Sequence, residues 1–263
     1  MASLDDLIPF EVGRGNRMQQ LSSRLYSRQA LGLMHIDREK RLYFLCKRCM
    51  DIVLSLLLLV ATLPLLLLIA LLIKVDSPGP VLFRQERVGL RKRSIGGEEA
   101  WQLGTFIMYK FRTMYHNSHP GIHQRFVRAL IRGNETEVAR LRNNSVVNKL
   151  TNDPRVTRVG KVLRKTRLDE LPQIWNVLRG DMSLVGPRPP IAYEVAEYDP
   201  RYWRRLGTIP GCVGLWQVSG WCTVGFEDMV ELDTWYIEHQ SLWLDMRILL
   251  QTPWAVLSGK GGE

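Results

Sequence analysis

The sequence predicts an α-rich α/β protein that is attached to a membrane through one apolar segment. Every residue from Ile52 to Ile73 is uncharged, and that stretch is long enough to cross a hydrocarbon core about 30 Å thick. The formal net charge of +10 predicts attraction to polyanions or to an anionic membrane surface. Eight tryptophans favour a lipid interface over a nucleic-acid module, so no nucleic-acid partner is expected.

The apolar segment carries positive charge on both sides. Pro64, near its middle, would remove a backbone hydrogen bond and kink the helix. Since cationic flanks prefer the cytoplasmic side of a membrane, charge favours a segment that enters and leaves by the same face. A re-entrant helix-break-helix and a single-pass helix with a tolerated proline both fit these residues. The flanking cations are Arg38, Lys40, Arg41, Lys47 and Arg48 before the segment, and Lys74, Arg84, Arg87, Arg91, Lys92 and Arg93 after it.

Residues 1–45 are expected to form an N-terminal extension without catalytic groups, partly helical near residues 17–33. The four cysteines do not form the pattern of a disulfide framework in a chain of 263 residues. Cys46 and Cys49 have the spacing of half a zinc site, but no second pair completes it. Free thiols in a reducing compartment are the simpler interpretation.

Residues 76–263 are expected to form the main domain. A turn at residues 76–80 ends the apolar helix, and short strands are predicted at residues 81–83 and 106–111 with a polar turn at 91–97. Residues 117–148 look like an insertion of one or two surface helices, split at Gly133-Asn134. The run Tyr109-Lys110-Phe111-Arg112 suits either phosphate binding or a solvated basic strand.

Asp169 and Glu170 are adjacent carboxylates that follow a basic amphipathic helix over residues 156–165. A second helix is predicted from Glu170 to Leu178, ended by Gly180. Asp169 therefore fits two roles, an N-cap of that helix or, with Glu170, a ligand of Mg²⁺ in phosphoryl transfer. Two further helices are predicted at residues 226–239 and 241–257, the last suited to a lipid interface.

From about Cys46 to the C-terminus the chain resembles the bacterial sugar transferase family, monotopic enzymes that start glycan assembly on a lipid carrier. The resemblance rests on many motifs in one order rather than on any single one. They are Lys47-Arg48-x-x-Asp51, residues 76–81, Phe83-Arg84-Gln85-Glu86-Arg87-Val88-Gly89, residues 109–114, residues 152–160, Leu168-Asp169-Glu170-Leu171-Pro172-Gln173, and residues 176–189 ending in Gly186-Pro187-Arg188-Pro189.

The resemblance implies an enzyme that transfers a sugar-1-phosphate from a nucleotide diphosphate sugar, with UDP as the expected nucleotide, to polyprenyl phosphate such as undecaprenyl phosphate. Asp169 would be the nucleophile that forms an aspartyl phospho-sugar and releases UMP, and Glu170 with Asp169 would hold Mg²⁺. Lys110, Arg164 and Arg188 match basic positions of the family and would bind phosphate, as would the neighbouring Arg112. The alternative for these residues is ion pairing at the surface.

The resemblance also implies a re-entrant membrane helix over residues 46–75, broken at Pro64, with the active site at the cytoplasmic face of the bacterial inner membrane. Asp51 is expected to pair with cations at the membrane edge. The chain departs from the family pattern at Leu63, where serine is frequent before the proline, at Arg167, and at Gly220-Trp221-Cys222. A homodimer is compatible with these features. The rival hypothesis is a non-catalytic, membrane-anchored protein that binds anionic lipid or nucleic acid through its basic surface.

Overall fold

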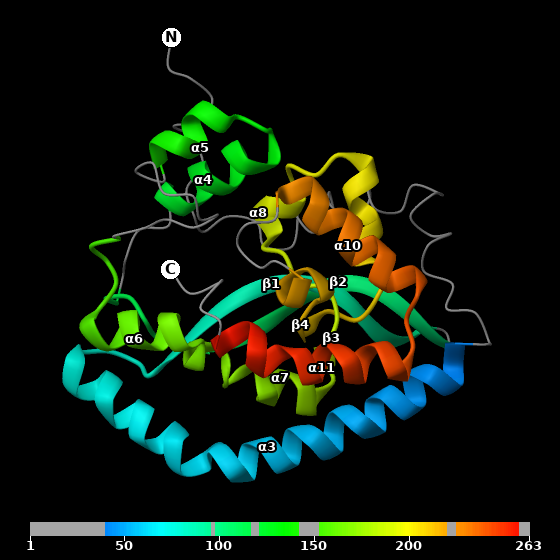
Figure 1. Ribbon diagram of the computed structural model, residues 1–263, viewed down its shortest axis with the longest axis horizontal. Helices are drawn as coiled ribbons and strands as arrows, with labels where there is room; N and C mark the ends of the chain where they lie inside the picture. Colours follow the sequence, from blue (N-terminus) through cyan, green and yellow to red (C-terminus); the bar gives the residue numbers. More distant parts are fainter. Residues whose placement is uncertain (1–39, 96–97, 117–120, 142–152, 220–224, 258–263) are drawn as a thin grey trace. The chain divides into compact units, whose positions relative to one another are not determined.

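The structure is a computed structural model, and it describes residues 40–95, 98–116, 121–141, 153–219 and 225–257 (Figure 1). The predictions for residues 1–39 and for the loop at 220–222 therefore lie outside the described residues. The first described element is α3 (Lys40–Asp76), a helix of 37 residues. Because α3 begins at Lys40, the predicted domain boundary at residues 45/46 falls inside a helix.

The chain stays helical through Pro64, so the predicted break in secondary structure is absent. Figure 1 shows α3 as a curved helix, which is the usual response to one lost hydrogen bond at a proline. The Thr62 hydroxyl donates to the carbonyl of Leu58 at 2.7 Å. Ser55 Oγ is buried without a hydrogen-bond partner among the described residues. Neither hydroxyl therefore compensates for the amide hydrogen that Pro64 lacks.

Most of the apolar surface of α3 faces outward. Within the described residues, α3 is the one helix that is long and apolar enough to cross a membrane. Its exposed leucines include Leu57, Leu67 and Leu71, each more than half exposed. Soluble proteins rarely leave such a continuous apolar surface uncovered, so α3 is suited to a lipid environment.

A long antiparallel hairpin lies at the centre of the fold. It joins β1 (Leu82–Ile95) to β2 (Glu98–Phe111), with Leu82 opposite Phe111 and Ile95 opposite Glu98. The predicted strands were much too short, because consecutive charged residues such as Glu86-Arg87 and Arg91-Lys92-Arg93 break the alternating pattern of β1 and look like loop in the sequence. One face of the hairpin packs Phe106 and Met108 into a core with Tyr236 and Ile248, and Val88 on the other face joins a second core.

Short helices and a two-stranded parallel sheet surround the hairpin. The prediction of helices on both sides of Gly133-Asn134 is confirmed, and the helices at residues 226–239 and 241–257 are also confirmed to within one residue at each boundary. The elements are α4 (Gly121–Ile131), α5 (Glu135–Leu141), α6 (Arg158–Thr166), η1 (Leu168–Glu170), α7 (Gln173–Arg179), β3 (Ser183–Val185), α8 (Ala192–Val195), η2 (Pro200–Leu206), β4 (Gly211–Val213), α9 (Leu215–Ser219), α10 (Phe226–Glu238) and α11 (Leu242–Leu257).

Polar contacts fix the first half of α3 against the rest of the fold, alongside α7, β3 and α11 (Figure 1). Arg48 donates to the last carbonyls of α7, at Val177 and Leu178. Asp51 accepts a hydrogen bond from the amide of Leu184 at 3.0 Å. Asp51 therefore has a structural role, although it accepts this bond from the backbone and not from the cations that the sequence analysis expected.

Lys47 makes the strongest of these contacts. Its ammonium lies 2.7 Å from Asp245 of α11, and both side chains are almost fully buried. The hydroxyls of Tyr43 and Tyr236 donate to the same carboxylate, at 2.9 and 2.6 Å. We call these four residues the Lys47–Asp245 network, and each of its charges is matched within the protein.

Candidate active site

The Asp169-Glu170 pair lies in a tight 3-10 turn between two helices. α6 ends at Thr166 and is capped by Arg167, which has a left-handed backbone conformation (φ 59°), the only positive φ of a non-glycine residue in the described part of the chain. The turn η1 follows, and α7 begins only after Pro172. Asp169 is therefore not the N-cap that the sequence suggested. A left-handed non-glycine residue stores backbone strain, a feature that is frequent at functional sites.

α6 holds this turn against the end of β2. The amide of Thr157 donates to the carbonyl of Thr113 at 3.0 Å, and the Thr157 hydroxyl caps the helix at Gly160. A Cβ on Gly160 would lie 2.1 Å from the carbonyl oxygen of Thr113, so only glycine permits this approach. Asp76, at the end of α3, also accepts from the amide of Val159. The apolar helix α3 and the Asp169-Glu170 turn are thereby connected through α6.

Glu170 is held by two cations from distant parts of the sequence. Its Oε1 lies 3.1 Å from Lys110 Nζ and 2.9 Å from Arg188 Nη2, and its Oε2 accepts a longer bond of 3.4 Å from Arg188 Nη1. Lys110 is near the end of β2, and Arg188 lies in the loop that follows β3. The structure thus brings together three of the predicted site residues around one carboxylate.

Asp169 differs from its neighbour. Among the described residues, its half-buried carboxylate forms no hydrogen bond and no ion pair. Burial, followed by repulsion from Glu170, raises its pKa above the ordinary aspartate value. Burial acts in the same direction on Glu170, but Arg188 and Lys110 outweigh it and hold the Glu170 pKa well below its usual range. Two adjacent carboxylates are therefore distinguished by their surroundings, one bound and one free.

The two cations are shifted in opposite directions. Burial lowers the pKa of Lys110 to about 8, although Glu170 opposes the shift. Burial also acts on Arg188, but the attraction of Glu170 prevails and raises its pKa. At neutral pH both side chains carry their positive charge beside the carboxylate pair.

Arg164 and Arg112, the other predicted phosphate ligands, lie in different places. Arg164 donates to the hydroxyl of Thr113 at 3.0 Å, and its charge acts on Asp169. Arg112 is buried and its guanidinium donates to carbonyls at the end of α3, including Ser77 at 2.6 Å and Pro78 at 2.9 Å. The structure thus places the Arg112 guanidinium against the end of α3 and not beside the carboxylate pair. β2 ends at Phe111, so the next side chain turns toward α3.

Asn176 is a positioning residue that the sequence analysis missed. Its fully buried amide accepts from the backbone of Tyr109 at 3.0 Å and donates to the carbonyl of Ile107 at 2.7 Å. The side chain therefore extends the ladder of β2 immediately before Lys110 and fixes that lysine relative to α7. A polar residue inside an otherwise apolar helix segment was the available signal.

The insertion is not the plain surface appendage that we predicted. Ile131 of α4 is buried in the core that contains Val195 and Tyr198. His123 Nδ1 lies 2.6 Å from the hydroxyl of Tyr193, next to α8. Burial, followed by the charge of Arg87, lowers the pKa of His123 to about 4, so it is neutral at physiological pH. α4 thus brings a histidine into the cationic surroundings of the carboxylate pair.

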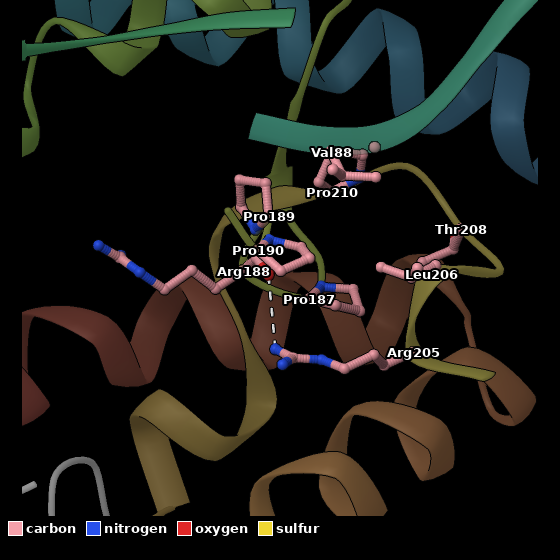
Figure 2. A pocket seen from close by; sticks show the side chains of 10 residues that line it. Val88, Pro187, Arg188, Pro189, Pro190, Arg205, Leu206, Thr208 and Pro210 are labelled. Atoms are coloured by element: carbon pink, nitrogen blue, oxygen red, sulfur yellow. Dashed lines mark hydrogen bonds between the residues drawn. The ribbon is translucent and has the colours of Figure 1, made fainter. Parts of the chain in front are cut away.

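A small pocket lies behind the loop that carries Arg188, but it has room for about one water molecule. Figure 2 shows that the Arg188 side chain points away from this pocket, while Arg205 donates to the Arg188 carbonyl at 3.4 Å. This pocket lies beneath the loop and is too small for a nucleotide sugar. It is lined by Val88, Gly89, Pro187, Arg188, Pro189, Pro190, Arg205, Leu206, Thr208 and Pro210.

The carboxylate pair has a donor set that fits magnesium. Mg²⁺ is usually held by one or two carboxylates together with substrate phosphates and water. Asp169 has no other partner among the described residues, and Glu170 Oε2 accepts only the 3.4 Å bond. The described ranges contain no group of three or more histidine, cysteine, aspartate or glutamate residues that could hold a metal ion, so the pair would share the ion with substrate and water.

Comparison with known proteins agrees with this site. The profile of the family described as "Bacterial sugar transferase" matches residues 42–259. The chain is 39% identical to the undecaprenyl-phosphate galactose phosphotransferase of Salmonella typhimurium, over 82% of this chain and 41% of that protein. It is 41% identical to the UDP-glucose:undecaprenyl-phosphate glucose-1-phosphate transferase of Caulobacter vibrioides, over 78% of this chain and 67% of that protein.

A third relative is closer in length, namely the exopolysaccharide production protein ExoY of Rhizobium meliloti, which is 37% identical over 82% of this chain and 88% of that protein. By contrast, the chain spans about two fifths of the length of the Salmonella protein. The family match covers the apolar helix, the carboxylate pair and both cations that hold Glu170. The chain belongs to the bacterial sugar transferase family.

Proposed function

We propose that this protein transfers a sugar-1-phosphate from a UDP-sugar to undecaprenyl phosphate or a similar polyprenyl phosphate, and so initiates assembly of a glycan such as an exopolysaccharide. The observation that carries the proposal is that the two adjacent carboxylates have different surroundings. Glu170 is bound by Lys110 and Arg188, while Asp169 keeps a free carboxylate with a raised pKa. Oppositely shifted neighbours are typical of paired catalytic groups.

In the first step a carboxylate oxygen of Asp169 bonds to the phosphorus that carries the sugar. The bond from this phosphorus to the bridging oxygen breaks, and UMP leaves with that oxygen. In the second step an oxygen of the lipid phosphate attacks the same phosphorus and the bond to Asp169 breaks. The products are a polyprenyl diphosphate sugar and the original carboxylate, so one difficult transfer is divided into two.

Lys110 and Arg188 would bind phosphate oxygens while they orient Glu170, and Arg164 adds a third positive charge near Asp169. The proposed magnesium ion would be held by Glu170 and Asp169 with phosphate oxygens of the donor. When bound, it would neutralise negative charge on the transferring phosphoryl group. The raised pKa of Asp169 makes its carboxylate more basic, which favours attack once the group is ionised.

The proposed location is the cytoplasmic face of the bacterial inner membrane, with α3 as a re-entrant anchor. The cationic flanks of α3 support the same side for both of its ends. The exposed tryptophans of α11, Trp243 and Trp254, are each 78% exposed and would lie in the headgroup region. Labelling of single engineered cysteines near Lys40 and near Asp76 tests this topology. Accessibility from opposite faces of the membrane would replace it with a single pass.

The activity is tested with full-length protein held in nanodiscs. The protein is incubated with Mg²⁺, polyprenyl phosphate and a panel of radiolabelled UDP-sugars, and release of UMP is followed. We expect one donor to give lipid-linked product and, when the lipid phosphate is omitted, labelled protein. Lipid binding without UMP release from any donor would favour the non-catalytic alternative.

A further inference from the structure

Arg87 is a buried cation that the proposed reaction has not yet used. Its side chain is 7% exposed, and it forms no ion pair with a carboxylate in the described part of the chain. Its Nη1 donates to the carbonyl of Pro189 at 2.7 Å and its Nη2 to Gln85 Oε1 at 2.7 Å. Its Nε is buried without a partner among the described residues. Proteins rarely leave a buried charge unpaired, because desolvation is costly.

The hairpin places Arg87 on the same side as Lys110. Residues opposite each other in an antiparallel pair project to one face, and alternate residues share that face. Phe83 is opposite Lys110, and Arg87 is opposite Phe106. Arg87, Gln85 and Lys110 therefore project from one face of the sheet, toward the carboxylate pair that Lys110 contacts.

The loop of Arg188 is tied to the same strand. The amide of Val88 donates to the carbonyl of Pro190 at 2.9 Å, next to the bond from Arg87 to Pro189. The two residues that follow Arg188 are thus held in place by β1. Figure 2 shows Val88 and this proline loop together. The charges of Arg188 and Glu170 both act on Arg87, which places the guanidinium within electrostatic reach of the site.

The surroundings of Arg87 leave its charge uncompensated. Burial, followed by repulsion from Arg188, lowers its pKa to about 10, so it remains protonated at neutral pH. Glu194 attracts it, but that carboxylate accepts from the hydroxyl of Tyr198 at 2.8 Å and lies 3.5 Å from Arg205. Glu170 is already bound by Lys110 and Arg188. An additional anion is what this cluster lacks.

We propose that Arg87 is a third phosphate-binding residue, whose buried guanidinium is compensated only when the diphosphate of the donor occupies the site. The proposal rests on the proposed function for the identity of that diphosphate. Two of the five N–H groups of the guanidinium are used by Pro189 and Gln85, and the remainder can donate to phosphate oxygens. Arginine suits this task because its donors are fixed in a planar fork.

Two variants test the proposal in opposite ways. Arg87→Met removes the charge and keeps a long apolar side chain. Gln85→Glu keeps Arg87 but gives it a carboxylate at the position of an existing 2.7 Å contact. Arg128→Met is the matched control, because Arg128 is an exposed cation on α4 that pairs with Glu197. Each protein is studied at full length in nanodiscs.

The first readout is the increase in Tm that inorganic pyrophosphate gives in the absence of Mg²⁺. We expect wild type and Arg128→Met to be stabilised, and Arg87→Met and Gln85→Glu to lose most of that increase. Without pyrophosphate, Gln85→Glu should have a higher Tm than wild type, since a buried cation has gained a counter-ion. If Arg87→Met does not fold, Gln85→Glu still decides the question.

The second readout is the KM for the UDP-sugar, which we expect to rise about tenfold or more in Arg87→Met and Gln85→Glu, as for a lost charge-assisted hydrogen bond. A purely structural Arg87 predicts instead that Gln85→Glu binds pyrophosphate and donor as wild type does, and this result would overturn the proposal. Absence of pyrophosphate stabilisation in wild type would overturn it as well. Failure of every UDP-sugar in wild type, with the pyrophosphate results intact, would refute the proposed donor and leave the anion site standing.

Discussion

Two buried clusters in this protein contain a lysine beside a carboxylate, and they differ in how completely their charges are matched. Around Lys47 and Asp245, two tyrosine hydroxyls complete the set of partners, and both charged side chains are almost fully buried. Around Lys110 and Glu170, additional cations crowd one carboxylate, while Asp169 has no partner among the described residues. The charges of the first cluster are matched within the protein, whereas we propose that a ligand completes the second.

The difference in charge matching agrees with the role that we assign to each cluster. The Lys47–Asp245 network joins α3 to α11, so its value lies in a fixed geometry, and full pairing supplies that geometry. In the proposed reaction the Asp169-Glu170 turn accepts a phosphorylated substrate, and an excess of positive charge would favour binding of that substrate. The left-handed backbone of Arg167 and the unpaired Asp169 carboxylate are destabilising features of the kind that is frequent at functional sites.

The largest effect is expected from Asp169→Asn. An asparagine retains the size of the side chain but cannot form the phosphoryl bond, so UMP release should fall by at least about a thousandfold. The labelled protein adduct should disappear while the protein stays in the membrane fraction. Asp245→Asn is the comparison variant, because it alters the matched cluster and leaves the nucleophile in place. Wild-type turnover by Asp169→Asn would show that another group is the nucleophile.

The second prediction concerns stability. Lys47→Met leaves the Asp245 carboxylate buried without its cation, which should cost about 3–5 kcal/mol of the free energy of unfolding. Lys110→Met should cost less than about 1 kcal/mol, because Arg188 continues to neutralise Glu170. Unfolding by denaturant in detergent micelles measures both values. Equal losses in the two variants would remove the distinction between the clusters.

The third prediction uses the pKa of Lys110. Its folded-state value is about 8 against an ordinary value of 10.5. As pH rises through 8 the ammonium loses its proton, so kcat/KM should fall about tenfold per pH unit above that point if the cation is required. Bound donor phosphate would raise this pKa, and the decline in kcat should therefore occur at higher pH than the decline in kcat/KM.

The free energy of unfolding should change with pH in the opposite direction to kcat/KM. Because the unfolded chain holds this proton more tightly than the folded one, the contribution of Lys110 to the free energy of unfolding increases with pH between about 8 and 10.5. Lys110→Arg stays charged throughout this range and removes both trends. A kcat/KM profile that is flat from pH 7 to 10 in wild type would exclude an essential role for the Lys110 charge.

The sequence predicted which residues make up the turn better than it predicted the geometry of the turn. Asp169 and Glu170 are adjacent in the chain, so their proximity needed no structure, and motif order supplied Lys110 and Arg188 through the family resemblance. Spacing alone does not bring Lys110 to Glu170, since these residues lie 60 positions apart and meet only because Asn176 fixes β2 against α7. The continuous α3 was also missed, because proline statistics indicate a kink but do not give its size.

Arg87 and Arg112 show why charged residues in strands are difficult to assign from sequence. Both arginines follow residues that suggest a strand, and both are buried. Arg87 lies inside β1 and shares a face with Lys110, whereas Arg112 comes just after β2 ends, where alternation no longer predicts the direction of a side chain. The sequence analysis predicted a phosphate-binding role for Arg112 and none for Arg87. The reason is that the ends of the strands could not be located to within one residue.

The smallest effect on activity is expected from Arg112→Met. Its guanidinium donates to Ile73, Ser77 and Pro78 at the end of α3. Loss of these bonds leaves buried carbonyls unpaired and should lower the free energy of unfolding by about 1–3 kcal/mol. Because Arg112 forms no hydrogen bond or ion pair with the carboxylate pair in the described residues, the donor KM of the folded fraction should stay within about twofold of wild type. A tenfold rise in KM at unchanged stability would instead assign Arg112 to the phosphate-binding group with Lys110.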